Sequence, residues 1–301
     1  MQSVMIGAGA VIASFLPQML AAAGVSIEAP LGHIPNTVKY SFYIGAIVLL
    51  SAIIITIKTT PEYPPADMEK FKEMQKQSFS VSKTLKEMWQ AFISMPQTMK
   101  RLAWVQFFTW AAFMIMWVYF AVGAAQAVFH AAPGTPAYEE AANWGSSCFG
   151  IYNGVAFVFS FALLWLTTKF SAKAIHIICL IIGGLGLASL GLTLFGFQFT
   201  KMGLIFPMIC IGIAWSSNLS MPYALLSNAL PPEKMGFYMG VFNFFIVIPQ
   251  ICVNLFFGPI MKHLLGGSAI AAVGLGGLSL LIAAFCMTFV KDNTIKETKQ
   301  A

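Results

Sequence analysis

Charged side chains are scarce in this 301-residue sequence: Asp, Glu, Lys and Arg make up 9% of it, whereas 58% of its residues are apolar. Apolar runs of about 20 residues recur along the chain, and a helix of that length crosses the hydrocarbon core of a bilayer. Short alternating segments, which the strands of a membrane barrel would show, are not the pattern here. We therefore expect an all-α polytopic membrane protein.

Eight apolar runs are long enough to be membrane-spanning helices. We expect these spans near residues 3–23, 40–58, 102–122, 149–168, 174–196, 203–229, 236–260 and 268–290. None of them contains Asp or Glu, so the sequence offers no acidic group at mid-membrane depth.

The sequence also lacks the residue clusters that metal sites and catalytic centres use. Its five cysteines have no metal-ligand spacing, and we expect them to pack between helices. The four histidines, at positions 33, 130, 176 and 263, fall in loops or at helix ends, so we expect them at the membrane surface. A membrane-embedded enzyme would need paired acids, a histidine cluster, or a nucleophile with its base. We therefore expect no enzyme, no metal and no cofactor.

The basic residues are unevenly distributed between the two sides of the membrane. If the spans alternate in direction, Lys39, Lys201 and Lys262 lie on one side, and the rest of the 17 Lys and Arg lie on the other. The positive-inside rule then places residues 59–101 and the C-terminus in the cytoplasm, as expected for a multi-pass protein of the cell's inner membrane. The net charge of +6 is thus a topology signal, and we expect no nucleic-acid partner.

One polar segment divides the chain. Residues 59–101 begin rich in proline and then become charged, which separates two spans from six. We expect residues 1–58 to be the end of an N-terminal helical half and 59–101 to be a cytoplasmic linker. Residues 102–290 would then be a C-terminal half of six helices, and 291–301 a cytoplasmic tail.

Polar residues on a membrane helix are expected to face a partner or a cavity, because an unpaired amide in lipid costs several kcal/mol. In the third span, Gln106, Trp110, Phe113 and Trp117 follow helical spacing and share one face. An amide beside indole rings suits a sugar, which presents hydroxyl edges and an apolar C–H face. A packing stripe or an interfacial aromatic belt is the alternative.

The seventh span carries a second polar face. Asn243, Val247, Gln250 and Asn254 recur at intervals of four, three and four residues, so three amides lie on one side of the helix. We expect them to bind substrate, with interhelical hydrogen bonding as the alternative.

The sixth span supplies a third polar face. Trp215, Asn218 and Pro222 share one side of this helix, which Pro207 and Pro222 should kink. We expect Trp215 and Asn218 to bind substrate, together with Asn153 from the start of the fourth span.

Two segments carry a resemblance to a known family: "MPQTMKRLAWVQFFTWAAFMIMWVY" (95–119) and "GIAWSSNLSMPYALLSNALPPEKMGFYMGVFNFFIVIPQ" (212–250). They resemble the seventh helix and the tenth-to-eleventh helix region of the glycoside-pentoside-hexuronide cation symporters. These belong to the major facilitator superfamily, and the proton-coupled sucrose and maltose transporters are the most similar branch.

The resemblance implies a major facilitator fold in which the eight transmembrane helices are equivalent to helices 5–12 of twelve. The chain would then be a fragment that lacks the first four helices and the acidic residues associated with cation coupling. The turn "LPPEKMG" would be the cytoplasmic turn between helices ten and eleven. We expect Glu233 and Lys234 there to act in gating, with a plain capped turn as the alternative.

The function that follows is secondary active transport of a neutral sugar by alternating access, with proton symport. The sugar would be a disaccharide such as maltose or sucrose, or a related glycoside. We expect the partners to be a small-molecule sugar and the lipid bilayer, and we expect a monomer. A membrane receptor or scaffold without transport, or a transporter of a different polar solute, remains the alternative.

Overall fold

A computed structural model gives the fold of the chain, and every regular element in its described residues is helical. Those residues are 2–26, 34–61, 67–69, 71–72, 86, 89–90, 92–132, 135–231 and 234–292. The chain divides into two units: Met1–Ser14 with Met95–Ala301, and Phe15–Ser94. The first is called the main unit below.

Eight stretches of the described chain are long and apolar enough to cross a membrane, which confirms the eight expected spans. Six of them involve a single long α-helix: α1 (Gln2–Ala22), α2 (Asn36–Thr59), α5 (Gln97–Ala127), α6 (Pro136–Leu166), α7 (Ala172–Ala188) and α12 (Ala269–Thr288). The 3₁₀ helix η1 (Ser189–Phe195) extends α7. The other two spans are interrupted: α8 (Ile205–Asn218), which follows η2 (Met202–Leu204), continues as α9 (Met221–Ser227), and α10 (Met235–Phe242) continues as α11 (Phe244–Leu264).

Two of the spans differ from the expected ones because of a helix cap and a proline. Helix α6 begins well before residue 149, because Thr135 caps it by accepting a hydrogen bond from the Tyr138 backbone N–H at 3.3 Å. The sixth span breaks after Asn218, where Pro222 lies in the first turn of α9 and cannot donate to the α8 ladder. Pro207 lies in the first turn of α8, where its missing N–H breaks no helical bond.

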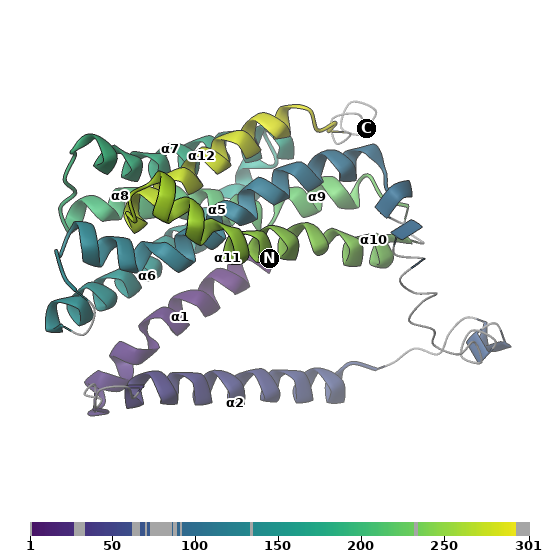
Figure 1. Cartoon of the computed structure of the whole chain (residues 1–301). Coiled ribbons are helices and arrows are strands. Elements are labelled where there is room, and N and C mark those ends of the chain that lie inside the picture. The colour runs from purple at the N-terminus through teal and green to yellow at the C-terminus, as the bar shows by residue number, and fades with distance from the viewer. Residues whose placement is uncertain are drawn as a thin grey trace. The chain divides into compact units, whose positions relative to one another are not determined.

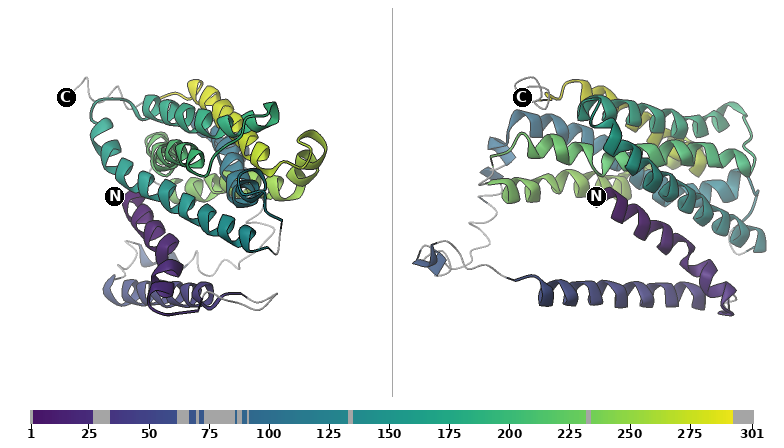
Figure 2. Two further views of the ribbon diagram at one scale, coloured as in Figure 1. Left: turned by 90° about the vertical axis from the view of Figure 1, so that its left-hand side faces the viewer. Right: turned by 180° about the vertical axis from the view of Figure 1, so that it is seen from behind.

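The spans of the main unit form a ring. Helix α5 packs against α12, α12 against α7, α7 against α8, α8 against α6, and α6 returns to α5 (Figures 1 and 2). Helix α11 lies outside this ring and packs mainly on α5. The core inside the ring includes the fully buried side chains of Phe113, Met116 and Phe120 of α5 and Ile211 of α8. Helices α5 and α8 therefore supply central residues of the bundle.

Small residues in the runs 183–192 and 271–281 let the ring close tightly. A Cβ atom added to Gly277 of α12 would lie 2.1 Å from the backbone nitrogen of Ala188 at the end of α7. A Cβ atom added to Gly183 of α7 would lie 2.5 Å from the Ala214 Cβ on α8. Contacts this close replace the hydrophobic driving force, which is weak between helices surrounded by lipid.

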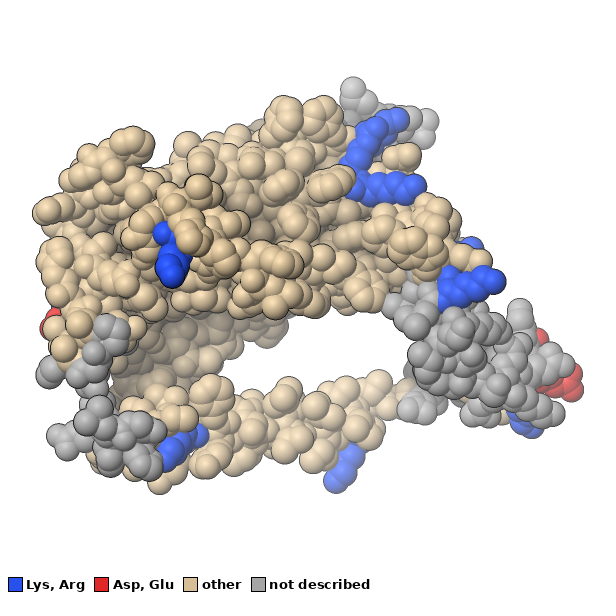
Figure 3. All heavy atoms as spheres, in the orientation of Figure 1, with Lys and Arg blue, Asp and Glu red and all other residues tan. Residues whose placement is uncertain are grey.

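Basic side chains fasten one end of the bundle, where α5 and α7 begin and α12 ends. The Lys173 ammonium donates to the backbone carbonyls of Thr288 and Val290, and the Arg101 guanidinium donates to that of Phe289. These carbonyls carry the negative end of the α12 dipole, so cations are favoured there. In Figure 3, most Lys and Arg atoms on the visible face of the bundle lie toward this end, and its body is almost free of charge.

The opposite end is held by Lys201. Its ammonium lies 2.6 Å from the Glu140 carboxylate and above the rings of Phe129 and Trp144, at 5.0 and 5.3 Å from their centroids. The Trp144 indole N–H donates to the Lys201 carbonyl at 3.1 Å. This cluster ties the start of α6 to the segment before α8.

Candidate functional site

Four aromatic side chains meet where α5 faces α8. We call Trp110, Phe113 and Trp117 of α5, together with Trp215 of α8, the aromatic cluster. The Trp215 ring stands edge-to-face against the other three, with centroid distances of 5.6 Å to Trp110, 4.8 Å to Phe113 and 5.5 Å to Trp117. The helical spacing of the α5 residues places all three on one face, and the structure thus joins the aromatic residues predicted on two separate spans.

Helix α6 borders the cluster through Tyr152. The Trp117 indole N–H points to the Tyr152 hydroxyl oxygen at 3.4 Å, and Trp117 is only partly buried. The neighbouring Asn153 donates to the Phe149 carbonyl of its own helix at 2.9 Å. Its side-chain amide is therefore partly engaged, unlike the two amides below.

Gln106 and Asn218 carry amides that are completely buried and make no hydrogen bond within the described residues. The indole N–H of Trp110 is buried and unpartnered in the same way. Buried polar groups are nearly always paired, so these three unpaired side chains are candidates for hydrogen bonds to a polar ligand or water.

The two amides lie on the same side of the aromatic cluster. Helices α5 and α8 are separated by two intervening spans and so run antiparallel. Gln106 precedes Trp110 by four residues and Asn218 follows Trp215 by three, which is about one helical turn in each case. Because the directions are opposed, both steps lead toward the end of the bundle where α5 begins. The two amides therefore lie about one helical turn from Trp110 and Trp215, toward the same end of the bundle.

Each residue in the last turn of α8 faces a different neighbour. Trp215 enters the aromatic cluster, Ser216 hydrogen-bonds Ser160 of α6 at 2.9 Å, and the Ser217 hydroxyl lies 2.8 Å from Nδ1 of His176 on α7. Asn218 ends the helix with its amide unpartnered. This single turn of α8 thus contacts α5, α6 and α7.

His176 lies near the start of α7, as expected of a histidine at a helix end, but its side chain is buried between helices, with 0% of its surface exposed. His130 and His263 are exposed as expected, and His33 lies outside the described residues. Sequence reasoning missed His176 because it lies only a few residues inside the apolar run "AIHIICLIIGG". Ser171 could have been recognised in the sequence as a helix-capping residue. A helix that begins there places His176 in its second turn.

The predicted face of α11 lies apart from this site. Asn243 and Asn254 are exposed and Gln250 is partly exposed, and the Asn254 amide donates to the Gln250 carbonyl of its own helix at 2.8 Å. Helix α11 packs near Ile115 of α5, which lies on the opposite side of that helix from Trp110. The role of these three amides in binding stays a prediction.

Of the two predicted gating residues, Lys234 is exposed and precedes α10, where its backbone N–H donates to the Pro231 carbonyl at 3.1 Å. Glu233 lies outside the described residues.

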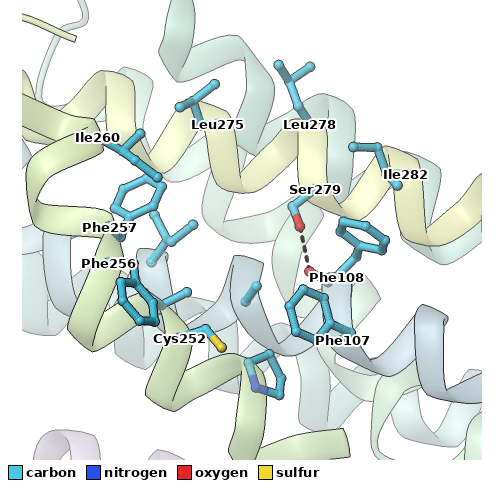
Figure 4. A pocket seen from close by; sticks show the side chains of 14 residues that line it. Phe107, Phe108, Cys252, Phe256, Phe257, Ile260, Leu275, Leu278, Ser279 and Ile282 are labelled. Atoms are coloured by element: carbon cyan, nitrogen blue, oxygen red, sulfur yellow. Dashed lines mark hydrogen bonds between the residues drawn. The ribbon is translucent and has the colours of Figure 1, made fainter. Parts of the chain in front are cut away.

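A groove of about 530 Å³ runs between α5, α11 and α12, but its chemistry differs from that of the aromatic cluster (Figure 4). Its walls are almost entirely apolar, with Phe108, Phe256 and Leu278 among them. The Ser279 hydroxyl in the groove already donates to the Phe108 carbonyl at 2.7 Å. With no free polar group identified on its wall, this groove suits hydrocarbon and offers a sugar nothing to bind.

The spans, the broken helices and the polar groups between them are features of membrane transporters. Comparison with families supports this reading: the profile of the Major Facilitator Superfamily matches residues 1–252. No curated protein matches the chain. The family match covers most of the sequence, and the chain therefore belongs to the major facilitator superfamily of membrane transporters.

Proposed function

We propose that this protein moves a neutral sugar across the membrane by alternating access, coupled to a proton, and that it belongs among the glycoside-pentoside-hexuronide symporters. The substrate class is a disaccharide such as maltose or sucrose, or a related glycoside. The observation that carries this proposal is the pairing of the aromatic cluster with the unpartnered amides of Gln106 and Asn218.

A sugar matches both parts of this site. Its C–H face can pack on an indole ring, and its hydroxyls can both donate to an amide oxygen and accept from an amide nitrogen. The Trp110 indole N–H is a third donor at the same place. Formal charges on the protein are not required, which fits a neutral solute.

The rings of the cluster now pack on one another, with Trp110 and Trp215 exposing 9% and 8% of their surface. A sugar ring would enter only if the indoles separate. The break between α8 and α9 supports such a movement, because helical hydrogen bonding is already interrupted next to Asn218. We propose that substrate entry separates α5 from the last turn of α8.

The distribution of basic residues supports a proposal for the orientation of the protein. We propose that the end of the bundle fastened by Lys173 and Arg101 faces the cytoplasm of a cell bounded by the inner membrane, by the positive-inside rule. Lys234, which precedes α10, would lie at that end, and we propose that Glu233 and Lys234 act in gating. We further propose that the protein works as a monomer.

The decisive experiment is uptake of labelled sucrose, maltose and glucose by cells that express the protein, with and without a proton uncoupler. The test variant is Gln106→Leu, which replaces the amide with an apolar side chain of similar bulk, and Cys252→Ala on α11 is the control. Loss of one hydrogen bond to the sugar should lower uptake about 3- to 10-fold, which corresponds to about 0.7–1.4 kcal/mol.

The same variant should not weaken the fold. Gln106 makes no hydrogen bond in the described structure, so replacing it by leucine removes a desolvated amide and should leave stability unchanged or raised. A variant that is stable yet transports poorly supports the binding site. Unchanged uptake in Gln106→Leu would exclude this site, and no uptake of any of the sugars by well-expressed protein would favour another polar solute or a receptor role.

A further inference from the structure

His176 is an ionisable side chain in the interior of the helix bundle. It lies in the second turn of α7, has 0% of its surface exposed, and places Nδ1 2.8 Å from the hydroxyl of Ser217 on α8. Its second ring nitrogen, Nε2, is buried without a partner among the described residues. Ionisable groups inside membrane bundles are costly to keep there, so such a residue points to a function.

The helices around His176 provide no opposite charge. Helix α7 packs against α8, α9, η1 and α12, and the described residues of these elements contain no Asp, Glu, Lys or Arg. Leu163, near the end of α6, also packs on α7, but the acidic residues of α6 are at its beginning, more than 20 residues earlier. Their titratable groups are Cys210, Tyr223 and Cys286.

Helix α7 itself carries Cys179 and Lys173. The Lys173 ammonium is bound to the carbonyls at the end of α12, and the Lys173 backbone N–H donates to the Asp292 carboxylate at 3.3 Å. That carboxylate is thus engaged at the backbone of Lys173, three residues before His176 in the sequence.

The two protonation states of the ring therefore fit this site unequally. The neutral ring has one donor and one acceptor nitrogen and no charge; Ser217 pairs with Nδ1, and only Nε2 stays without a partner in the described structure. A protonated ring carries two N–H donors and a positive charge, and the second N–H would have no acceptor. An unpaired buried charge is strongly unfavourable, so a proton can stay on His176 only if the ring or the end of α8 moves.

Any such movement is transmitted to the aromatic cluster over a short distance. Ser217 is two residues from Trp215 and precedes Asn218, the last residue of α8. The Ser217–His176 contact thus holds the turn of α8 that carries an indole and a free amide, immediately before the helix breaks.

We propose that His176 is a proton-binding site of this protein, and that protonation releases the last turn of α8 from α7. This inference rests on the proposed proton coupling and names a residue that carries the proton within the six-helix part of the chain. The ligand is the proton itself, taken from water when the bundle opens and returned when it closes.

The test uses the 301-residue chain in lipid nanodiscs and does not require transport. Nitrogen NMR of the histidine rings reports whether His176 is neutral or protonated, and hydrogen exchange measured by mass spectrometry reports the opening of residues 215–227. We expect a neutral ring at pH 7.5. On acidification to pH 5, the ring should take up a proton while exchange in this segment accelerates at least about fivefold, after correction for the intrinsic pH effect.

The matched variants are His176→Asn, which can still hydrogen-bond Ser217 but cannot take up a proton, and His263→Asn, which removes an exposed histidine on α11. Loss of the acid-induced acceleration in the first and its retention in the second support the proposal. Equal acceleration in both overturns it.

The wild-type chain decides the question even if His176→Asn does not fold. A ring that stays neutral down to pH 5, or one that is protonated without faster exchange in 215–227, overturns the proposal. Neither result would bear on sugar binding, which the Gln106→Leu uptake experiment tests separately.

Discussion

Replacing Gly277 by alanine tests whether close backbone contact holds the main unit together. The added Cβ atom would lie 2.1 Å from the Ala188 backbone nitrogen, 2.6 Å from the Gly184 carbonyl oxygen and 2.7 Å from the Ala188 Cα. All three neighbours are backbone atoms, so no side chain can rotate away. Helices α7 and α12 must separate instead.

The size of the effect follows from this separation. A Cβ atom is comfortable only beyond about 3.4 Å, so the helices would have to move apart by more than 1 Å along their contact. Overpacking of this kind costs about 1–3 kcal/mol. For a domain of this size, that corresponds to a fall in melting temperature of about 2–12 °C.

The assay is thermal unfolding of the detergent-solubilised chain, followed by intrinsic tryptophan fluorescence. Gly154→Ala is the control, because Gly154 is also within a helix but has nothing within 4 Å of an added Cβ. That substitution should be neutral, or stabilising by about 0.5–1 kcal/mol through helix propensity. If Gly277→Ala melts as high as Gly154→Ala, then α7 and α12 do not approach as closely as described.

Three further substitutions test other contacts. Lys173→Met should destabilise the chain by about 1 kcal/mol, because it removes the cation from the end of α12, whereas Lys169→Met should have little effect; equal melting of the two variants would exclude the cap. Ser160→Ala should cost about 0.6 kcal/mol in the same assay, as is typical for a hydrogen bond between membrane helices, and an unchanged melting temperature would show that the bond to α8 adds nothing. In cells that express the protein, Asn243→Ala should lower sugar uptake more than Cys252→Ala at matched expression, and equal small effects would remove α11 from the binding site.

Much of the fold could be predicted from the sequence, because the length of an apolar run and the period of a helix are local properties. They located all eight spans and placed Trp110 and Trp117 on one face of α5. Contacts between residues on different helices are not a local property. The contacts of Trp110 and Trp117 with Trp215 could therefore be seen only in the structure.

The same limit explains His176 and the polar face of α11. A histidine near the start of a span can lie at the surface or inside, depending on how deep its neighbours extend. Here Ser217 of α8 reaches its ring. For α11, the pattern showed that Asn243, Gln250 and Asn254 share a side, but periodicity alone does not say which neighbour that side faces.

The contacts of the final turn of α8 restrict which insertions and deletions this protein can accept during evolution. Its four residues, 215–218, point in directions about 100° apart, and three of them are matched to groups on α5, α6 and α7. A single substitution disturbs one of these matches. Inserting or deleting one residue between Ile205 and Trp215 would rotate the whole turn and misplace all of them at once. Length changes should therefore be tolerated in the segment before η2 but not within α8, even where many individual substitutions are accepted.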